Sequence, residues 1–336
     1  MSTNCATPEG TARYRDRFAD RHFREQQGLV LSSIGIGTYL GNADEATDAN
    51  YTRAIVRAVQ LGVNVIDSAA NYRFQRSERS IGQALQTLAN EHGIAREELV
   101  ICTKGGYLPF DGAPPRNVRE YFEETFVKPG IASFAEIVGG SHCMTPAYLQ
   151  SQLDQSLRNM KLECVDVYYI HNPESQLQHV PETEFYERLR LAFDRLEHNR
   201  KQGNLAYYGV ATWNGFRATP HHSLVRMVEA AREIGGEAHG FRFIQLPFNL
   251  AMPEAVNVAN ETIDGEAMPV VEAAKRLGVT VVASASLLQG KIPPAEAIQF
   301  AGETPGITTA LIGMSKVEHV EENLATDFTD EHGLSL

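Results

Sequence analysis

Eight short apolar runs, each followed by a segment with helical spacing, constrain the fold of this chain more than any other feature. None of the runs alternates in and out like a half-exposed antiparallel strand, so each is expected to be a buried parallel strand. Eight such units with no break in composition predict an α/β fold, a (β/α)8 barrel rather than a doubly wound sheet, with residues 1–336 as one domain. The runs are residues 31–38, 63–69, 99–106, 165–172, 205–213, 241–249, 279–287 and 307–314.

Two further segments extend this barrel. Residues 13–30 precede the first run and are expected to form a hairpin that closes the barrel floor, with residues 1–12 as a flexible N-terminus. The longest insertion, about residues 107–144, follows the third run and contains a predicted helix in "VREYFEETFVK". Because the loops after barrel strands carry substrate sites, we expect this insertion beside the functional site.

Charge and cysteine usage exclude several classes of function. With 30 basic and 42 acidic residues the net charge is −12, which disfavours nucleic acid or an anionic membrane as the main partner. The four cysteines, at positions 5, 102, 143 and 164, form no C-x-x-C pair, which predicts neither a disulfide framework nor a zinc site. No apolar leader and no run of 18 apolar residues is present, so a cytoplasmic location is expected.

Polar residues end three of the buried runs. Asp67 ends the second run, Lys104 the third and His171 the fourth, and Tyr72 follows five residues after Asp67. Taken singly, each has a structural explanation, such as a buried ion pair of Asp67 with Lys104 or a surface tyrosine. In a barrel, however, the carboxyl ends of all strands meet at one face, so the four side chains are expected to share one pocket. This joint placement favours catalysis.

The chemistry of the four side chains is complementary. A tyrosine has an ordinary pKa near ~10, and a lysine ammonium a few ångströms away favours the phenolate and lowers that pKa. Asp67 would keep Lys104 charged and oriented, because a buried ammonium needs a partner. His171 could hold a carbonyl oxygen beside the Tyr72 hydroxyl. Such a set transfers a proton to or from an oxygen while a second group attacks the carbon.

The order Asp-Tyr-Lys-His in these strand contexts resembles the aldo-keto reductase superfamily. The resemblance extends to "GIGT" at 35–38, "GVATWN" at 209–214, "IQLPFNL" at 244–250 and "LIGMSKVEHVEENL" at 311–324, and so covers nearly the whole chain. It implies a nicotinamide cofactor that lies across the top of the barrel without a Rossmann domain. It also implies hydride transfer between the nicotinamide C4 and a carbonyl carbon, with Tyr72 as the proton donor.

The resemblance also implies residues for the cofactor. Gln245 matches the residue that holds the carboxamide, whereas Thr212 stands where an asparagine is usual and Ser284 where an aromatic residue stacks on the nicotinamide. Trp213 or a loop residue could supply the stacking instead. The implied cofactor residues are Gly37, Thr38, Thr212, Gln245, Ser284, Gly313, Met314, Ser315, Lys316, His319, Glu322 and Asn323, and the implied substrate-pocket residues are Tyr107 and Trp213.

The nucleotide end of this predicted site lies near residues 313–323. "SKVE" at 315–318 is a capping-box pattern, so a helix is expected to begin with Ser315 at its N-cap and to point its amino terminus at an anion. His319 stands where NADP-specific members of the superfamily have an arginine, and Lys316 is a nearby fixed cation. These residues favour NADP(H) over NAD(H).

Three functions remain open at this point. The first is an oxidoreductase that acts on a small aldehyde, ketone or sugar. The second is a cofactor-sensing regulatory subunit with little turnover, suggested by the altered residues Ala211, Thr212 and Ser284, although an intact Tyr72 argues against it. The third is an NAD-linked sugar dehydrogenase. The tail after Phe328 is short and is expected to cover little of the pocket.

Overall fold

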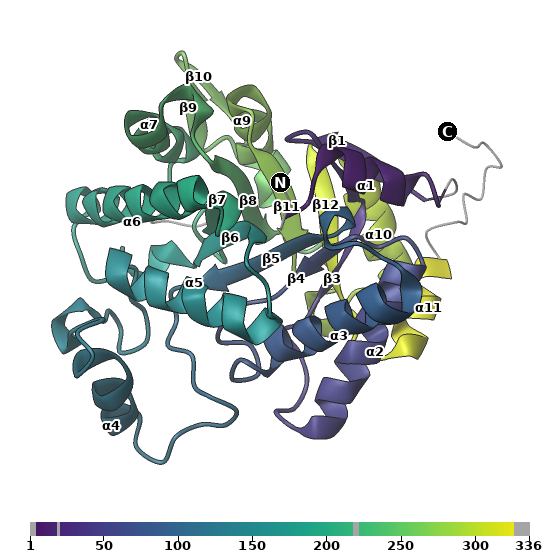
Figure 1. Cartoon of the computed structure of the whole chain (residues 1–336). Helices are drawn as coiled ribbons and strands as arrows, with labels where there is room; N and C mark the ends of the chain where they lie inside the picture. Colours follow the sequence, from purple (N-terminus) through teal and green to yellow (C-terminus); the bar gives the residue numbers. More distant parts are fainter. Residues whose placement is uncertain (1–4, 19–20, 218–221, 326–336) are drawn as a thin grey trace.

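A closed barrel of eight parallel strands forms the centre of the molecule (Figure 1). The computed structural model of the chain describes residues 5–18, 21–217 and 222–325. The strands follow the order β11-β12-β3-β4-β5-β6-β7-β8 around the barrel, so the predicted fold class is confirmed. Their bounds are β3 Ile34–Gly37, β4 Val65–Asp67, β5 Val100–Gly105, β6 Val165–His171, β7 Leu205–Ala211, β8 Phe241–Pro247, β11 Thr280–Ser284 and β12 Ile307–Gly313.

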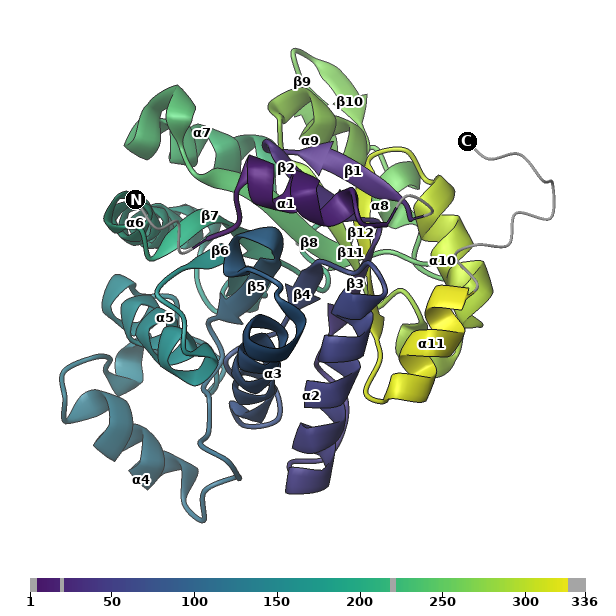
Figure 2. The same cartoon turned by 45° about the vertical axis from the view of Figure 1, so that its right-hand side comes forward.

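Helices surround the barrel (Figures 1 and 2). Thr145 is the N-cap residue of α5 and Pro146 is its first residue, and Gly93, at φ +64°, ends α3 in the left-handed conformation that glycine adopts readily. A short helix α8 (Glu254–Asn257) and a ribbon of β9 (Glu261–Ile263) and β10 (Glu266–Met268) precede α9. The surrounding helices are α2 Glu45–Gln60, α3 Arg76–His92, α5 Pro146–Met160, α6 Glu182–Gln202, α7 Leu224–Gly235, α9 Val270–Leu277, α10 Pro294–Glu303 and α11 Val317–Ala325.

Side chains along each strand point alternately toward the helices and into the barrel, and this divides the core into two layers. Outward side chains such as Ile66, Ile101 and Ile170 pack under the helices in one large cluster. Inward side chains fill the barrel itself in a second cluster that includes Val65, Cys102 and Tyr169. Because side chains two positions apart point the same way, the next inward residue of each strand lies one layer nearer the carboxyl mouth. In β4, β5 and β6 those next residues are Asp67, Lys104 and His171.

An antiparallel hairpin closes the opposite end of the barrel, as predicted. It consists of β1 (Phe23–Gln26) and β2 (Leu29–Ser32). Its hydrogen bonds reach the starts of several barrel strands: Arg24 Nη1 donates to Thr308 O (3.0 Å), Gln27 Nε2 to Thr280 Oγ1 (3.1 Å), and Tyr207 Oη to Gln27 O (2.9 Å). The carboxyl face therefore holds the open mouth.

The expectation of a flexible N-terminus is wrong for part of that segment. Pro8–Arg15 form helix α1, whose N-cap residue Thr7 accepts a hydrogen bond from the backbone N–H of Gly10 (2.9 Å). The buried Tyr14 hydroxyl then ties the helix to Val63 O (3.1 Å) before β4. An N-cap threonine followed by Pro8 was a readable helix start.

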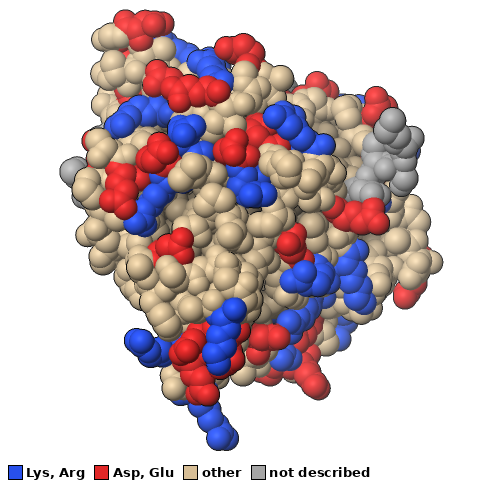
Figure 3. Space-filling view, turned by 60° about the vertical axis from the view of Figure 1, so that its left-hand side comes forward, with Lys and Arg blue, Asp and Glu red and all other residues tan. Residues whose placement is uncertain are grey.

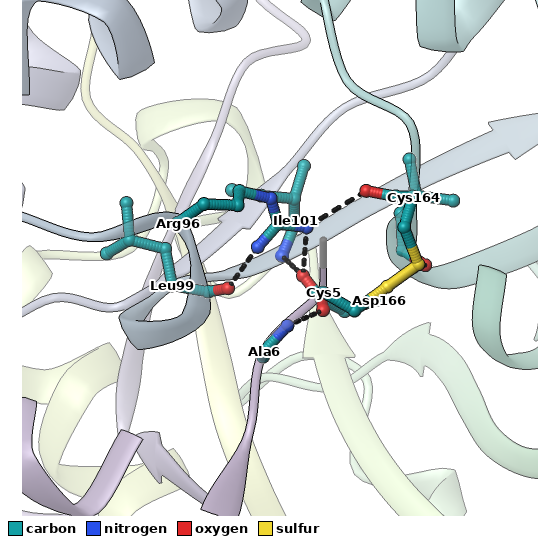
Figure 4. The surroundings of a disulfide bond; sticks show 8 residues. Cys5, Ala6, Arg96, Leu99, Ile101, Cys164 and Asp166 are labelled. Atoms are coloured by element: carbon teal, nitrogen blue, oxygen red, sulfur yellow. Dashed lines mark hydrogen bonds and ion pairs between the residues drawn. A yellow bond between two sulfur atoms is a disulfide. The ribbon is translucent and has the colours of Figure 1, made fainter. Parts of the chain in front are cut away.

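The cysteine pattern predicted no disulfide framework, but the structure contains a disulfide. Cys5 and Cys164 form a disulfide whose Cα atoms lie 5.4 Å apart, next to the buried Asp166 carboxylate (Figure 4). That carboxylate accepts hydrogen bonds from Ala6 N (2.5 Å) and Arg96 Nη2 (2.7 Å), which fix the N-terminal segment against β6. The two cysteines are 159 positions apart, so only the folded chain brings them together. This bond is one that the spacing of the cysteines did not predict.

The insertion after β5 folds against α5 (Figures 1 and 2). Its predicted helix is present as α4 (Val118–Phe122), which continues into a π-helical turn over Glu123–Val127. Phe122 and Phe126 form a small apolar cluster with Tyr148 of α5, whose ring centroid lies 5.1 Å from that of Phe126. The insertion is therefore anchored by a core of its own.

Acidic and basic side chains are interspersed on the face drawn in Figure 3, without one large basic patch on it. In the described ranges, none of the helices is both long and apolar enough to cross a membrane.

Candidate active site

A buried ion pair lies at the carboxyl mouth of the barrel. The Lys104 ammonium donates to the Asp67 carboxylate and to Ser68 O (2.7 Å), and Gln245 Nε2 donates to Asp67 Oδ2 (2.9 Å). Burial lowers the pKa of Lys104, but Asp67, Tyr72 and Cys102 together raise it by more, so the pKa is raised overall. Lys104 is therefore a fixed positive charge inside the barrel mouth.

Tyr72 and His171 lie next to this pair. The Lys104 Nζ atom is 5.0 Å from the centroid of the Tyr72 ring, and the Tyr72 and His171 ring centroids are 5.7 Å apart. The structure thus brings together the four residues that the sequence placed in one pocket. Lys104 and His171 are far in sequence from Asp67 and Tyr72, and from each other. The four residues come together because Asp67, Lys104 and His171 lie at or near the ends of β4, β5 and β6, which are neighbours in the barrel.

The pKa of Tyr72 differs from the sequence-based expectation. Burial raises the pKa of the phenol by more than the nearby Lys104 ammonium lowers it, so the net direction is upward from 10.0. The lysine does act in the expected direction, but desolvation of the phenolate is the larger effect. The Tyr72 hydroxyl is consequently protonated at neutral pH.

A left-handed turn presents Tyr72. The three residues after it, Arg73, Phe74 and Gln75, all have positive φ, at 48°, 59° and 71°. Such backbone angles cost energy in a residue with a Cβ and need support from the surroundings. Arg73 supplies that support: its Nε donates to Asn42 O (2.9 Å), it pairs with Asp48, and it is buried. Arg73 was missed because nothing in an arginine indicates a left-handed turn.

His171 is held by the insertion. The Nε2–H of the buried His142 donates to His171 O (2.7 Å), while Gln176 Nε2 donates to His142 Nδ1 (2.9 Å), which fixes that tautomer. The ring centroid of Tyr107 lies 5.1 Å from that of His171, at a nearly perpendicular angle. Burial, and then the charge of Lys104, lower the pKa of His171 well below 6.5, so its imidazole is neutral. The sequence analysis assigned no site role to His142.

The residues implied for the nicotinamide end lie at strand ends, but their partners differ from the expectation. The amide nitrogen of Gln245 donates to the Asp67 carboxylate. Thr38 Oγ1 donates to Asp67 O (3.0 Å) inside the barrel wall, and Gly37 pairs with Asp67 in the sheet register. Thr212 and Ser284 end at the same face, after β7 and in the last position of β11.

The residues implied for the nucleotide end lie around the start of α11. Gly313 ends β12, Met314 is buried, and Ser315 is half-buried. The helix begins at Val317, one residue later than the capping-box pattern predicts, so Lys316 directly precedes it. Lys316, His319 and Glu322 are exposed, whereas Asn323 lies on the buried side of the helix.

Large apolar side chains are exposed around the mouth. Tyr39 is 58% exposed, Trp213 41% and Leu250 47%, and each follows the carboxyl end of a barrel strand. Tyr39, which the sequence analysis missed, packs its ring 4.9 Å from that of Tyr72. Exposed apolar groups around a set of polar side chains are typical of a ligand site. Trp213 lies directly after β7 at this mouth, and its pocket role stays a prediction.

Glu174 fixes the loop that carries Trp213. Its Oε1 accepts hydrogen bonds from the backbone N–H groups of Trp213 (2.7 Å) and Asn214 (2.9 Å). Glu174 follows β6 and is only 9% exposed, so it joins two neighbouring loops of the mouth. A glutamate three residues after His171 was a detectable signal, because loops after strands carry such supports.

Two buried polar atoms fit a bound ligand. Thr212 Oγ1 and His171 Nδ1 have no hydrogen-bond partner among residues 5–18, 21–217 and 222–325. Buried polar atoms without partners are rare, and a ligand with polar groups would satisfy them. The residues at the mouth therefore fit a cofactor or substrate with donors and acceptors. The tail after Phe328 lies outside the described residues.

Solved structures with the same fold include several oxidoreductases. A glycerol dehydrogenase from Gluconobacter oxydans superposes with a TM-score of 0.63 at 18% identity, covering 95% of this chain and 92% of that one. An aldo-keto reductase from Klebsiella pneumoniae in complex with NADPH superposes with a TM-score of 0.59 at 16% identity, covering 92% and 90%. At these identities the likeness shows the fold.

Two sequence relatives match most of this chain. The chain is 26% identical to the L-glyceraldehyde 3-phosphate reductase of Escherichia coli, over 82% of this chain and 64% of the relative's length. It is 22% identical to a Schizosaccharomyces pombe protein named "Putative voltage-gated potassium channel subunit beta", over 96% of this chain and 92% of the relative.

A family-wide comparison covers most of the chain. Residues 33–293 match the Aldo/keto reductase family, and this span contains seven of the barrel strands together with Asp67, Tyr72, Lys104 and His171. The chain therefore belongs to the aldo/keto reductase family.

Proposed function

We propose that the chain is an NAD(P)(H)-dependent oxidoreductase that interconverts a carbonyl group and an alcohol in a small aldehyde, ketone or sugar. The observation that carries this proposal is the position of Tyr72 beside the buried Lys104–Asp67 pair and His171 at the barrel mouth. A phenol next to a fixed ammonium is suited to proton exchange with a substrate oxygen.

Each residue of the set has a distinct part in the proposed reaction. The nicotinamide, when bound, supplies or accepts the hydride. Tyr72 gives its proton to the carbonyl oxygen in reduction, and the phenolate left behind is stabilised by the Lys104 ammonium. Asp67 holds that ammonium in place. The neutral imidazole of His171 donates one N–H to the substrate oxygen and orients it.

The raised pKa of Tyr72 favours the reductive direction. A protonated phenol is ready to act as an acid, whereas oxidation of an alcohol requires the phenolate first. We therefore expect reduction of carbonyl compounds to be faster than alcohol oxidation at neutral pH. NADP(H) is proposed over NAD(H), with Lys316 as a cation near the predicted nucleotide end.

A test of the proposal is the variant Tyr72→Phe, assayed by loss of NADPH absorbance with a panel of small aldehydes. Loss of a general acid is expected to lower turnover by about 10²–10⁴-fold. Cofactor affinity, followed by fluorescence titration, should stay within about twofold of the native value, a change of less than ~0.5 kcal/mol.

Tyr207→Phe is the matched control. Tyr207 loses the same hydroxyl, but its bond goes to Gln27 O at the barrel floor, far from the proposed chemistry. This variant should retain turnover. Equal activity of Tyr72→Phe and the native chain would refute the role of Tyr72.

A second candidate is a regulatory subunit that binds the cofactor with little turnover. It is supported by the similarity to the protein named as a potassium channel subunit and by Ser284 in place of the stacking aromatic residue. Tight NADPH binding with no turnover over the whole panel would favour it. An NAD-linked sugar dehydrogenase would instead be indicated by faster oxidation of polyols with NAD than reduction with NADPH.

A further inference from the structure

A short turn after β6 contacts an aromatic side chain at the barrel mouth. The turn begins with Asn172, directly after His171, and continues as a 3-10 turn over Pro173–Ser175. Tyr107 Oη lies 3.1 Å from Ser175 Oγ and accepts a hydrogen bond from Asn172 Nδ2 (3.2 Å). The Tyr107 ring is therefore fixed beside His171, with 5.1 Å between the two ring centroids.

Glu174 of the same turn holds a second aromatic residue, because its side chain contacts the segment after β7. One carboxylate oxygen accepts hydrogen bonds from the backbone N–H groups of Trp213 and Asn214, at 2.7 and 2.9 Å, and the other lies 3.9 Å from Nε2 of the buried His222. A carboxylate makes stronger bonds to N–H groups than a neutral acceptor does. Gly215 packs so closely on the His222 ring that a Cβ there would lie 2.8 Å from it. The backbone that carries Trp213 is therefore held from two sides.

The strand register places Trp213 near the proposed chemistry. His171 pairs with Ala211 in the β6–β7 ladder, and the N–H of Asn172 donates to Ala211 O (2.6 Å). Trp213 follows Ala211 by two residues, and its side chain is 41% exposed although its backbone is held by Glu174. An indole that is fixed at its backbone and open to solvent is suited to stack on a ring of a ligand.

We propose that Glu174 is a positioning residue that holds Trp213 as a fixed wall of the substrate pocket, and that this wall selects carbonyl compounds with an aromatic ring. This inference rests on the proposed function, because it concerns the substrate of that same site. A stacked aromatic pair strengthens binding by about two- to tenfold. The gain is largest when the indole is already held in place, because ordering a mobile side chain on binding costs entropy.

The test compares KM and kcat for benzaldehyde and for propanal at saturating NADPH. Glu174→Ala is expected to raise KM for benzaldehyde about three- to tenfold and to change KM for propanal less than about twofold, because propanal has no ring to stack. Turnover should change less than about twofold for both, since the lost contact stabilises the ground state and the transition state equally. Glu174→Gln keeps a carbonyl oxygen at the same position along the side chain and should restore KM close to the native value.

The loop can also be followed without substrate or cofactor, because Trp213 is the single tryptophan of the chain. Glu174→Ala should lower the fluorescence anisotropy of the indole, since a released loop moves faster than the whole molecule. Glu174→Gln should keep the native anisotropy. Glu197→Ala is the matched control: Glu197 is equally buried and accepts the backbone N–H of Gly240, but it does so at the opposite, amino end of β8. It should change neither the anisotropy nor the ratio of the two KM values.

A double-variant cycle tests whether Glu174 acts through Trp213. In a Trp213→Ala background, Glu174→Ala should cause no further rise in KM for benzaldehyde. A full further rise, equal changes in KM for the two aldehydes, or an unchanged anisotropy in Glu174→Ala would overturn the proposal. If the native chain reduces both aldehydes but Glu174→Ala keeps the native ratio of KM values, only this inference fails. If the native chain turns over no carbonyl compound, the proposed function fails and this inference with it.

Discussion

Lys104 makes three contacts at the barrel mouth: with the Asp67 carboxylate, with Ser68 O, and with the face of the Tyr72 ring. Replacing it with methionine keeps the length of the side chain but removes the charge. Asp67 is then left as a buried carboxylate without its cation, which costs about 3–5 kcal/mol of stability. The pKa of Tyr72 should rise further, because the ammonium is the largest effect that lowers it.

The expected outcome for Lys104→Met is a large loss of turnover and an alkaline limb of the pH–rate profile that moves to higher pH. The direction follows because reduction needs the protonated phenol, which persists to higher pH when its pKa is higher. Urea unfolding and a pH–rate profile measure the two effects. The double variant Asp67→Asn, Lys104→Met should recover part of the stability but none of the turnover. An unmoved pH profile in the single variant would contradict the coupling of Lys104 to Tyr72.

Among single residues, the sequence predicted those site residues that lie at the ends of barrel strands. Asp67, Lys104 and His171 end consecutive buried runs, so their convergence follows from the barrel alone. Arg73 could not be predicted in the same way, because its role depends on a left-handed turn. The net pKa of Tyr72 also depends on burial, which the sequence does not show.

The insertion after β5 joins the active site through one histidine. Burial lowers the pKa of His142 to about 4, against 6.5 for a free histidine. Between these values the unfolded chain binds a proton that the folded chain does not, so the free energy of unfolding falls as pH decreases from 6.5 toward 4. The shift is equivalent to roughly 3 kcal/mol.

His142→Gln tests this linkage. At pH 7 the variant should be less stable than the native chain, because the hydrogen bonds to His171 O and Gln176 are disturbed. The difference in unfolding free energy between the two proteins should shrink as pH falls to 4, since only the native chain carries this depressed pKa. Urea unfolding at several pH values measures it, and a constant difference over that range would argue against the assigned cause.

Element boundaries can be predicted best where strong local signals exist. The Thr145-Pro146 pair, which opens α5, and Gly93, which ends α3, are such signals. The start of α11 was predicted one residue too early, because a capping-box pattern does not determine which residue is the first helical one. Helix α1 was missed although Thr7-Pro8 marked it, since it packs on the barrel floor rather than within a βα unit.

For the whole molecule, the disulfide between Cys5 and Cys164 links the N-terminal segment to the middle of the chain. A cross-link over 159 positions restricts the unfolded chain and is expected to add about 2–4 kcal/mol to stability. Cys5→Ser should lose that amount in urea unfolding without reductant. Adding reductant should lower the native chain to the level of the variant and leave the variant itself unaffected.

Thiol titration gives an independent check. The denatured, unreduced native chain should show two reactive thiols, those of Cys102 and Cys143. Four reactive thiols would contradict the disulfide.

The fold class itself was predictable from the sequence because eight repeats of one pattern define a barrel. A cross-link between distant positions was not predictable, because it depends on which positions the folded barrel brings together.

The same bond changes what a protease would produce. The insertion at 107–144 lies between Cys5 and Cys164 and bears exposed side chains such as Val118 and Phe134, in the kind of surface loop that proteases cut first. A chain cleaved there would still migrate as one covalent species in a non-reducing gel. It would separate into two fragments only after a thiol is added.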